Sequence, residues 1–556
     1  MNTRITKYVL GIVLCLFFSN AVKSQVVYEH LSNEGIYGFL DEMANINAIQ
    51  INDVVKPYSR QLIFEYLLEI ESGLSLGEIA LNKRQMDELK FYLSSYILEN
   101  QTPLKNKRGE DGVKGILNPP GLFFKNEDIK MGLQMIWGGA YSKNDNDSYT
   151  ESYGGASMMA YIGDNIGVYG NVRDRNIGQK LISPSYLNQI RAAPHKEYEK
   201  SIDFSETRGG FVYSWEWGNV GLIKDHIQWG TGYNGTNIQS GRNPSFAMLT
   251  LKLKPTEWFE FNYIHGWLNS EVVDSVNSYW TQGTFRPVYR QKYIAANMFT
   301  FYPWKKFNFS FGNSIVYSDL GGINASYLIP FLFYKSVDHT LNSTNIDGET
   351  GQNAQLFLSM SSRNIKNLHL HFTLYADDLS FTHFKKKDEF NFFSYKLGAR
   401  LSNYPFENFS FTFEFTHTNP LVFQHKIGTQ TYETSGYNLG HYLRDNAREY
   451  YLAINYKPIR GLSIDLSYEY AKKGDAFSYA EYANIPYFNI HTLPILENII
   501  WSSKVLALNA RYEIKANVYI YINIKHSNIT GDVESYTPEY YWGKNLTFTS
   551  GLNIGF

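Results

Sequence analysis

From Ile129 to the end of the chain, apolar and polar residues alternate with a period of two. In the stretch IKMGLQMIWGG, one face of this pattern carries Met131, Leu133, Met135 and Trp137. The opposite face carries Lys130, Gln134 and Gly138. Such alternation is typical of a β-strand whose two faces meet different surroundings. The pattern therefore predicts strands rather than helices for most of the chain.

The last segment, NLTFTSGLNIGF, has the same pattern. We expect its apolar face to point outward, with Leu546, Phe548, Leu552, Ile554 and Phe556. Its polar face then points inward, with Asn545, Thr547, Thr549 and Asn553. A chain that ends in an aromatic residue on such a strand resembles a substrate of the outer-membrane barrel assembly machinery, which we expect as a partner.

Short polar turns separate the alternating segments. Eight of them lie at Gly163, Gly218, Lys254, Tyr302, Ser362, Tyr404, Lys457 and Glu513. Several carry Pro near their start, which presets φ and removes a strand donor. Eight hairpins, with a first and a last strand, give about 18 strands, and an even number returns both chain ends to one side of a membrane.

The segments between the hairpins are long, as in residues 174–209, 319–353 and 419–448. Short turns on one side and long loops on the other are the polarity of outer-membrane barrels. The predicted fold is mainly β, a transmembrane antiparallel β-barrel of about 18 strands with a small N-terminal α-helical module. Outer-membrane lipid is then a partner.

Composition agrees with a barrel. Aromatic residues make up 16% of the chain, and the mean hydropathy of −0.33 is that of a polar chain. Beyond the first residues, no segment approaches the roughly 20 apolar residues of a transmembrane helix. The net charge is −2, without a long basic run, so nucleic acid is not an expected partner.

The first residues have the pattern of an export signal. Arg4 and Lys7 precede a short apolar core over residues 8–18, and we expect cleavage after Ser24. The predicted signal peptide covers residues 1–24 and exports the chain, and the predicted barrel then places the mature protein in the cell outer membrane. The single cysteine, Cys15, lies in this segment, so the mature protein has no disulfide and no thiol nucleophile.

Residues 32–99 have a helical period instead. Three short amphipathic helices are expected, with Ser59 and Asn82 as N-caps and Gln85 completing a capping box. We predict a periplasmic three-helix module over residues 25–104, a Gly- and charge-rich linker over residues 105–128, and the barrel over residues 129–556. The module either binds a partner or plugs the barrel.

The stretch GTGYNG, residues 230–235, matches the dinucleotide fingerprint G-x-G-x-x-G. That fingerprint needs a helix after it to receive the pyrophosphate, and TNIQSGRNP cannot start one. The stretch instead becomes the third outer loop, which either covers the barrel mouth or enters the lumen.

This loop and its edges form the best candidate site for a polysaccharide. Sugar sites combine aromatic faces with polar groups that bond hydroxyls and carboxylates. The candidate residues are Asp225, His226, Trp229, Tyr233, Asn234, Arg242 and Asn243. The alternative is that the glycines merely let an irregular loop pack, with Trp229 and Tyr233 filling space.

Charged side chains of both signs are expected to face the lumen. They are Lys396, Arg400, Glu414, Asp465, Glu469, Arg511 and Lys525. Such a lumen fits internal ion pairs that fill the barrel, and it fits a polar conduit equally well.

The catalytic and metal-binding motifs found in the sequence do not have the structural context that such sites need. Ser75 lies in a G-x-S-x-G match, but between two helices rather than after a strand. His369 and His371 share one face of a strand without an identifiable third ligand. We therefore expect no enzyme, no catalytic residue, no metal and no cofactor.

Three stretches together resemble the Wzi-like capsule assembly family of outer-membrane β-barrel proteins. They begin YGFLDEMANINAIQIND near the N-terminus, KDHIQWGTGYNGTNIQSGRNPSF in the third loop, and FNYIHGWLNSEVVDS after it. The specific part is the loop motif, with Trp229 followed by Gly230, Gly232, Ser240 and Pro244.

The resemblance implies a β-barrel with an N-terminal helical bundle. It also implies a lectin-like, non-enzymatic role in capsule or exopolysaccharide assembly and surface attachment, with surface polysaccharide as the partner. The alternative is an outer-membrane channel or transporter for small solutes. An outer-membrane enzyme ranks last, because no nucleophile and His pair can be named.

Overall fold

The structure is a computed structural model that describes residues 25–100, 102–105, 111–342, 351–377, 379–380, 382–386 and 388–555. The predicted signal peptide, with Cys15 and Ser24, and the terminal Phe556 lie outside the described residues.

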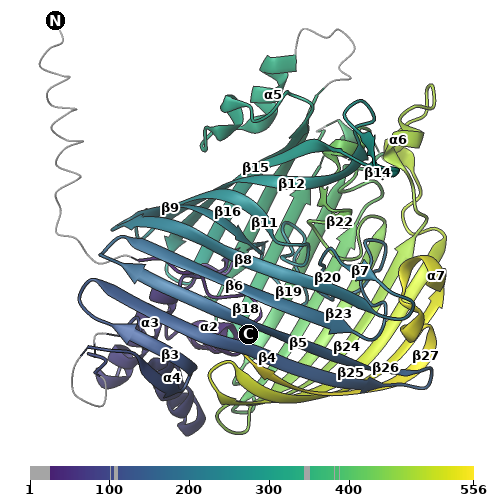
Figure 1. The fold of residues 1–556 in the computed structure, drawn as a ribbon. Helices are drawn as coiled ribbons and strands as arrows, with labels where there is room; N and C mark the ends of the chain where they lie inside the picture. The colour runs from purple at the N-terminus through teal and green to yellow at the C-terminus, as the bar shows by residue number, and fades with distance from the viewer. Residues whose placement is uncertain are drawn as a thin grey trace, which may run out of the picture.

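Eighteen long antiparallel strands of the described chain close into a barrel (Figure 1), as predicted. They are β4 (Ile129–Lys143), β5 (Ser148–Ile162), β6 (Ile166–Ile177), β8 (Ile202–Trp215), β9 (Gly218–Asp225), β11 (Phe246–Thr256), β12 (Phe259–Val273), β15 (Tyr289–Trp304), β16 (Phe307–Ser318), β17 (Asn353–Ser362), β18 (Leu368–Ala376), β19 (Phe393–Ser402), β20 (Phe409–Thr418), β23 (Ala447–Tyr456), β24 (Leu462–Gly474), β25 (Ile499–Lys515), β26 (Val518–Gly531) and β27 (Gly543–Ile554). The last strand pairs with the first, with Phe548 opposite Lys143 and Ile554 opposite Trp137.

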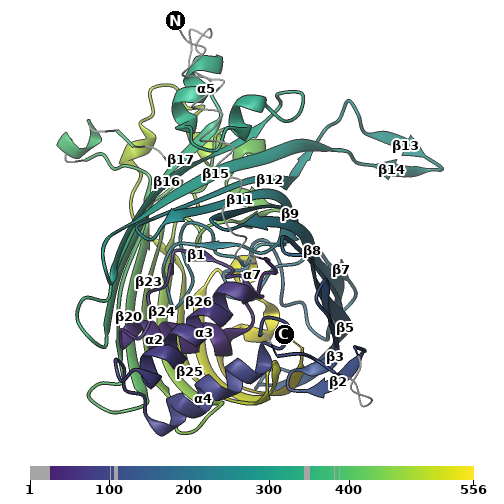
Figure 2. The same cartoon turned by 90° about the vertical axis from the view of Figure 1, so that its left-hand side faces the viewer.

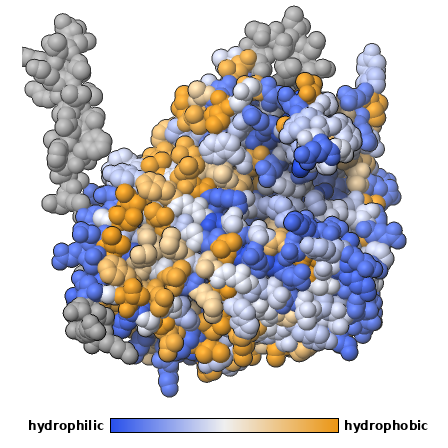
Figure 3. Space-filling model, viewed as in Figure 1, coloured by the Kyte–Doolittle hydropathy of each residue, from blue (hydrophilic) through white to orange (hydrophobic). Residues whose placement is uncertain are grey.

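The two faces of these strands follow the predicted alternation. In β27, Leu546 and Phe548 are 54% and 42% exposed, whereas Asn545 and Thr547 are each 1% exposed. Figure 3 shows apolar residues gathered in a band across the barrel wall, with hydrophilic residues on both sides of the band. The outer face therefore suits lipid hydrocarbon and the inner face is polar.

The eight predicted turns all join neighbouring strands at one end of the barrel, called here the turn end. The turns occupy residues 163–165, 216–217, 257–258, 305–306, 363–367, 403–408, 457–461 and 516–517. Most connections at the opposite end, the loop end, are long. They carry β7 (Lys196–Glu197), β10 (Gln228–Trp229), β13 (Tyr279–Thr281), β14 (Thr284–Arg286), η1 (Ala325–Leu328), α5 (Tyr334–Asn342), η2 (His383–Lys385), η3 (Gly428–Gln430), β21 (Glu433–Thr434), β22 (Tyr437–Asn438), α6 (Tyr479–Tyr482), η4 (Ile490–Thr492), α7 (Val533–Tyr536) and η5 (Glu539–Tyr541).

Three helices precede the barrel, as predicted: α2 (Glu34–Asn45), α3 (Arg60–Ser75) and α4 (Lys83–Ser95). The side chain of Ser59 accepts a hydrogen bond from Leu62 N, and Asn82 and Gln85 form the expected capping box. Figure 2 shows these helices lying across the turn end of the barrel. None of the described helices is long and apolar enough to cross a membrane.

The helices share one apolar core, which includes Ile36, Phe39, Leu67 and Leu89. Arg60 joins the segments that precede and follow the three helices, because its guanidinium lies 2.7 Å from carboxylate oxygens of both Glu29 and Glu99. All three of these side chains are largely buried, so each charge depends on the others for a partner.

The prediction of a linker over residues 105–128 is wrong for the second half of that segment. Residues 114–125 form a hairpin of β2 (Lys114–Leu117) and β3 (Pro120–Lys125), and β3 pairs with β4 through Leu122 and Leu133. The composition of this segment suggested a linker, but its short apolar runs, IL and LFF, add strands to the sheet beside the first barrel strand.

Candidate functional site

The connection between β9 and β11, residues 226–245, enters the barrel lumen rather than covering its mouth. Its short strand β10 pairs with β1 (Val55–Lys56), which precedes α3 in the N-terminal module. Gly230 N also donates to Val54 O over 2.8 Å, and Trp229 is only 1% exposed. A loop from the loop end and a segment from the turn end therefore meet inside the barrel.

The glycine-rich turn of this inner loop is anchored on Glu414 of β20. The carboxylate of Glu414 accepts hydrogen bonds from Tyr233 N and Asn234 N, each over 2.7 Å. Lys396 Nζ lies 3.0 Å from the same carboxylate, and His371 Nε2 lies 3.1 Å from it. The side chains of Glu414, Lys396 and His371 are fully buried. The predicted lumen-facing Lys396 and Glu414 thus hold the loop in place.

Glycine is required at residue 232 by close packing. A Cβ atom there would lie 2.2 Å from Gly235 O and 2.9 Å from the Lys396 side chain. Asn234, two residues further on, also donates from Nδ2 to Glu469, another predicted lumen residue, over 3.2 Å. The sequence match to a nucleotide fingerprint is therefore explained by a tight turn over buried charges.

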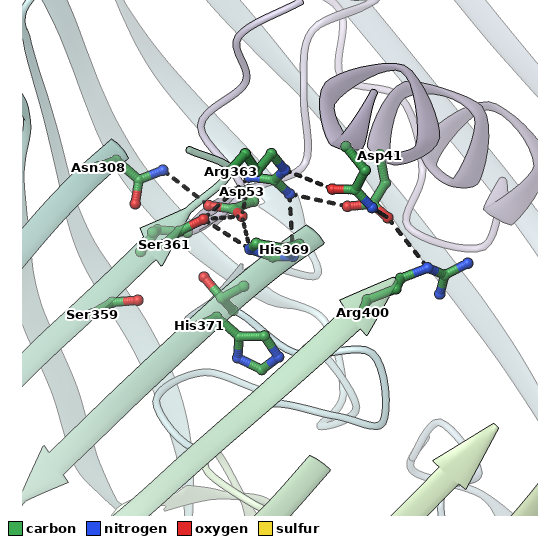
Figure 4. A network of polar contacts seen from close by, with 12 residues as sticks. Asp41, Asp53, Asn308, Ser359, Ser361, Arg363, His369, His371 and Arg400 are labelled. Atoms are coloured by element: carbon green, nitrogen blue, oxygen red, sulfur yellow. Dashed lines mark hydrogen bonds and ion pairs between the residues drawn. The ribbon is translucent and has the colours of Figure 1, made fainter. Parts of the chain in front are cut away.

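A second buried network joins the module to the barrel wall, and Figure 4 shows its members reaching toward one another from a helix of the module and from strands of the wall. Arg363, in the turn after β17, lies 3.1 Å from Asp41 and 2.8 Å from Asp53 of the module. His369 of β18 lies 3.1 Å from Asp53. Tyr233 of the inner loop donates to Asp41 over 3.1 Å, so module, wall and loop share one network.

Electrostatics explains why the module carboxylates stay charged there. Burial alone would raise the pKa of Asp53, but the Arg363 guanidinium and a hydrogen bond from His369 hold that pKa well below its usual range. Arg363 and Arg400 likewise lower the pKa of Asp41 against its burial. Breaking such a pair leaves an uncompensated buried charge, which is strongly destabilising.

Among the described residues, His369 and His371 do not belong to any group of three potential ligands close enough to share a metal ion. His369 and His371 are engaged by Asp53 and Glu414. A different group, His30, Asp225 and His226, brings potential ligand atoms within 4.8 Å of one another. Burial and the nearby Arg191 lower the pKa of His226 to about 3, and Arg208 lies 3.3 Å from Asp225. This arginine-rich setting disfavours a cation.

The structure divides the predicted polysaccharide site into two groups. Asp225, His226, Trp229, Gly230, Gly232, Tyr233 and Asn234 lie inside the barrel. Asp225 accepts a hydrogen bond from Tyr169 over 2.7 Å, and Tyr233 donates one to Asp41. Both side chains are therefore engaged by other residues of the protein. Ser240, Arg242 and Asn243 instead line a pocket at the loop end, with Pro244 buried directly after them.

This loop-end pocket lies between three connections. Besides the inner loop, residues 178–201 contribute Tyr186 and Asn188, and residues 419–446 contribute Tyr437, Asn438, Tyr442 and Arg444. The Arg242 guanidinium stacks over the Tyr442 ring at 5.5 Å. Arg444 donates from Nη2 to the backbone oxygens of Gly436, over 3.2 Å, and Pro184.

Neither guanidinium of this pocket has a carboxylate partner within 4.0 Å in the described part of the chain. Glu449 and Glu469 lie deeper, where both accept hydrogen bonds from Tyr442. Burial lowers the pKa of Arg242, although Tyr442 and these two carboxylates oppose the shift. The pocket thus presents two positive groups and several tyrosines to a ligand from the loop end.

Of the residues that line this pocket, only those of the inner loop were predicted from the sequence. The two other connections were recognisable as long outer segments, but nothing in the sequence indicates that residues near Tyr186 and near Arg444 meet Arg242. The signal that was present is compositional, since residues 437–444 combine two tyrosines, one asparagine and one arginine.

Comparison with known proteins identifies relatives. The family model described as capsule assembly protein Wzi matches residues 145–525. No curated protein matches the chain. Among solved structures, Wzi of Escherichia coli, an outer-membrane protein involved in group 1 capsule assembly and a carbohydrate-binding β-barrel, is similar at 10% identity with a TM-score of 0.57. The match covers 96% of this chain and 100% of that one.

The barrel OccD3 of Pseudomonas aeruginosa is more distant, with 11% identity, a TM-score of 0.43 and coverage of 82% of this chain and 95% of that one. The family match spans more than half of the chain, and the barrel with its N-terminal helices agrees with it. The chain therefore belongs to the Wzi capsule assembly family.

Proposed function

We propose that this protein holds a surface polysaccharide at the loop-end pocket of an outer-membrane barrel, as a lectin-like and non-enzymatic part of capsule or exopolysaccharide assembly. The observation that carries the proposal is the pair Arg242 and Arg444, two guanidinium groups without carboxylate partners in one tyrosine-lined pocket. Arginine is the side chain best suited to bind planar carboxylates, and tyrosine faces pack on sugar rings.

In this proposal the loop end faces the outside of the cell and the helical module lies in the periplasm, after export and removal of residues 1–24. The Escherichia coli relative is a carbohydrate-binding barrel, which supports a carbohydrate ligand here. Because the two arginines favour carboxylate groups, the expected ligand is a polysaccharide that contains acidic sugars. The residues from Asp225 to Asn234 then have a structural role: inside the barrel they support residues 240–244, which lie at the pocket.

Binding to a polyuronate tests the proposal. We expect the wild-type protein to bind alginate and not neutral dextran, because only alginate supplies carboxylates to the two arginines. Arg242→Ala and Arg444→Ala should each weaken alginate binding by at least about tenfold, since a hydrogen bond to a charged group contributes about 1.5–3 kcal/mol. Calorimetric titration of detergent-solubilised protein measures the effect.

Arg286→Ala is the matched control, because Arg286 is an exposed arginine of β14 outside the pocket. It removes the same charge and should bind alginate as the wild type does. Equal alginate affinity in the wild type and in the double variant Arg242→Ala with Arg444→Ala would show that the pocket does not bind the polysaccharide.

A further inference from the structure

The outer face of the barrel changes from apolar to basic toward the loop end of strands β23 to β27. These five strands lie side by side in the wall (Figure 1). Nearer the turn end their outward side chains are apolar and 43–49% exposed, as in Leu452, Leu466 and Leu506. Further toward the loop end, outward positions carry Arg448 on β23, Lys472 on β24 and Lys504 on β25. These three residues are called here the basic rim.

The residues of the basic rim are close neighbours in the sheet. Arg448 stands directly opposite Lys472. Lys504 stands opposite Tyr470, which is two residues before Lys472 on β24. The ammonium groups of Lys472 and Lys504 lie 4.8 Å and 5.3 Å from the centroid of the Tyr470 ring. Three cations are thus gathered around one tyrosine on the outside of the barrel.

The basic rim has no acidic counterpart on the wall. In the part of the chain that the structure describes, none of its three side chains has a carboxylate oxygen within 4.0 Å. No described outward position of β23 to β27 is acidic. A single lysine at a membrane boundary needs no partner, because its amine reaches water. Like charges directly opposite each other destabilise a sheet, however, so the pair Arg448 and Lys472 favours an anion between them.

The basic rim lies at the outer edge of the apolar band. On β25, the outward side chain of Ile514 is 41% exposed near the turn end, and Lys504 is ten residues from it. At about 3.3 Å per residue and a tilt of about 40°, this stretch spans roughly 25 Å, which is the height of the apolar band of an outer-membrane barrel. The basic rim is therefore level with the head groups of the outer leaflet.

We propose that the basic rim binds the phosphate groups of an outer-leaflet glycolipid, whose acyl chains lie on the apolar wall below. Guanidinium and ammonium groups bind phosphate oxygens through charge-assisted hydrogen bonds. A phosphate among Arg448, Lys472 and Lys504 offsets their mutual repulsion. Tyr450, which is 39% exposed and stands opposite Tyr470, offers an aromatic face to a sugar of the head group.

The position of the basic rim favours a lipid over a soluble anion. A glycolipid contacts both the three cations and the apolar side chains below them, whereas soluble phosphate contacts the cations alone. Clusters of basic residues beside an apolar membrane surface bind anionic head groups in this way. The basic rim is also separate from the loop-end pocket, whose Arg242 and Arg444 lie on connections rather than on the outer wall. The inference therefore does not rest on polysaccharide binding.

Native mass spectrometry of the detergent-solubilised protein tests the basic rim, with bisphosphorylated lipid A as the probe. Lys472→Ala with Lys504→Ala should bind several-fold less lipid A than the wild type at the same lipid concentration. Lys83→Ala with Lys90→Ala is the matched control, because it removes the same two charges from exposed positions of α4 in the module. It should bind lipid A as the wild type does. Heat modifiability on gels verifies that each barrel is folded.

Two further measurements separate the possible sources of the anion. Lipid A without its phosphates should bind the wild type several-fold less than the phosphorylated lipid does. Calorimetric titration with alginate should give the same affinity for the wild type and for Lys472→Ala with Lys504→Ala.

Equal binding of lipid A by the wild type and by this double variant would overturn the proposal, and so would equal binding of lipid A with and without phosphates. Displacement of bound lipid A by an equal concentration of inorganic phosphate would overturn the choice of a lipid. Loss of alginate binding in the double variant would assign the basic rim to the polysaccharide instead.

Discussion

Deletion of residues 25–104 is expected to turn a barrel of low conductance into an open pore. The module lies across the turn end and supplies Asp41 and Asp53 to Arg363 and the strand β1 to β10 (Figures 2 and 4). Without these contacts the inner loop loses its partners in the lumen. A barrel of about 18 strands is wide enough to conduct water and ions unless it is obstructed.

Single-channel recording in planar bilayers measures this effect, with the wild type near baseline and the deletion variant in the range of an open porin. Arg363→Ala keeps the whole chain but removes the ion pairs of the barrel wall with Asp41 and Asp53 of the module. This variant should raise the fraction of time for which the pore is open, by less than the deletion does. Heat modifiability confirms that each variant is a folded barrel. High conductance in the wild type would favour the alternative function, a channel or transporter for small solutes.

Glu414→Ala should lower the free energy of unfolding by about 3–5 kcal/mol. The substitution leaves Lys396 as a buried charge and removes the acceptor for two backbone N–H groups of the inner loop. Removal of one partner from a buried ion pair typically has a cost of this size. Urea unfolding of the barrel in detergent, followed by tryptophan fluorescence, measures the change.

Glu407→Ala is the control, since Glu407 is an exposed glutamate in the turn before β20 and should change stability by less than about 0.5 kcal/mol. Glu414→Gln retains the shape of the side chain and one acceptor oxygen, so its loss of stability should lie between those of Glu414→Ala and Glu407→Ala. A Glu414→Ala variant as stable as Glu407→Ala would show that the loop is held by other contacts.

The barrel was predictable because its determinants are local. A period of two fixes which face of each strand meets lipid, and the polar turns mark where strands reverse, so the order of the strands follows from the sequence. The helix caps at Ser59 and Asn82 are local as well. The signals for the hairpin over residues 114–125 were too short to distinguish it from a linker.

The path of a long loop is not local, which is why the candidate site was only partly predictable. Glu414 and Lys396 were recognisable as lumen residues, but not as partners of Tyr233 and Asn234, which lie far from them in sequence. One sequence signal was missed, since Asn297 of β15 and Asn313 of β16 occupy outward positions where a lipid-facing strand should carry apolar residues.

The most direct test of the central claim is the amount of surface polysaccharide that stays bound to cells. The strains would carry the wild type, a full deletion of the protein, Arg242→Ala with Arg444→Ala, and the control Arg286→Ala. We expect polysaccharide to be released into the medium by the deletion and the double variant, and to be retained by the wild type and the control. Retention in the double variant at the wild-type level, while the deletion releases polysaccharide, would contradict the assignment of glycan binding to the loop-end pocket.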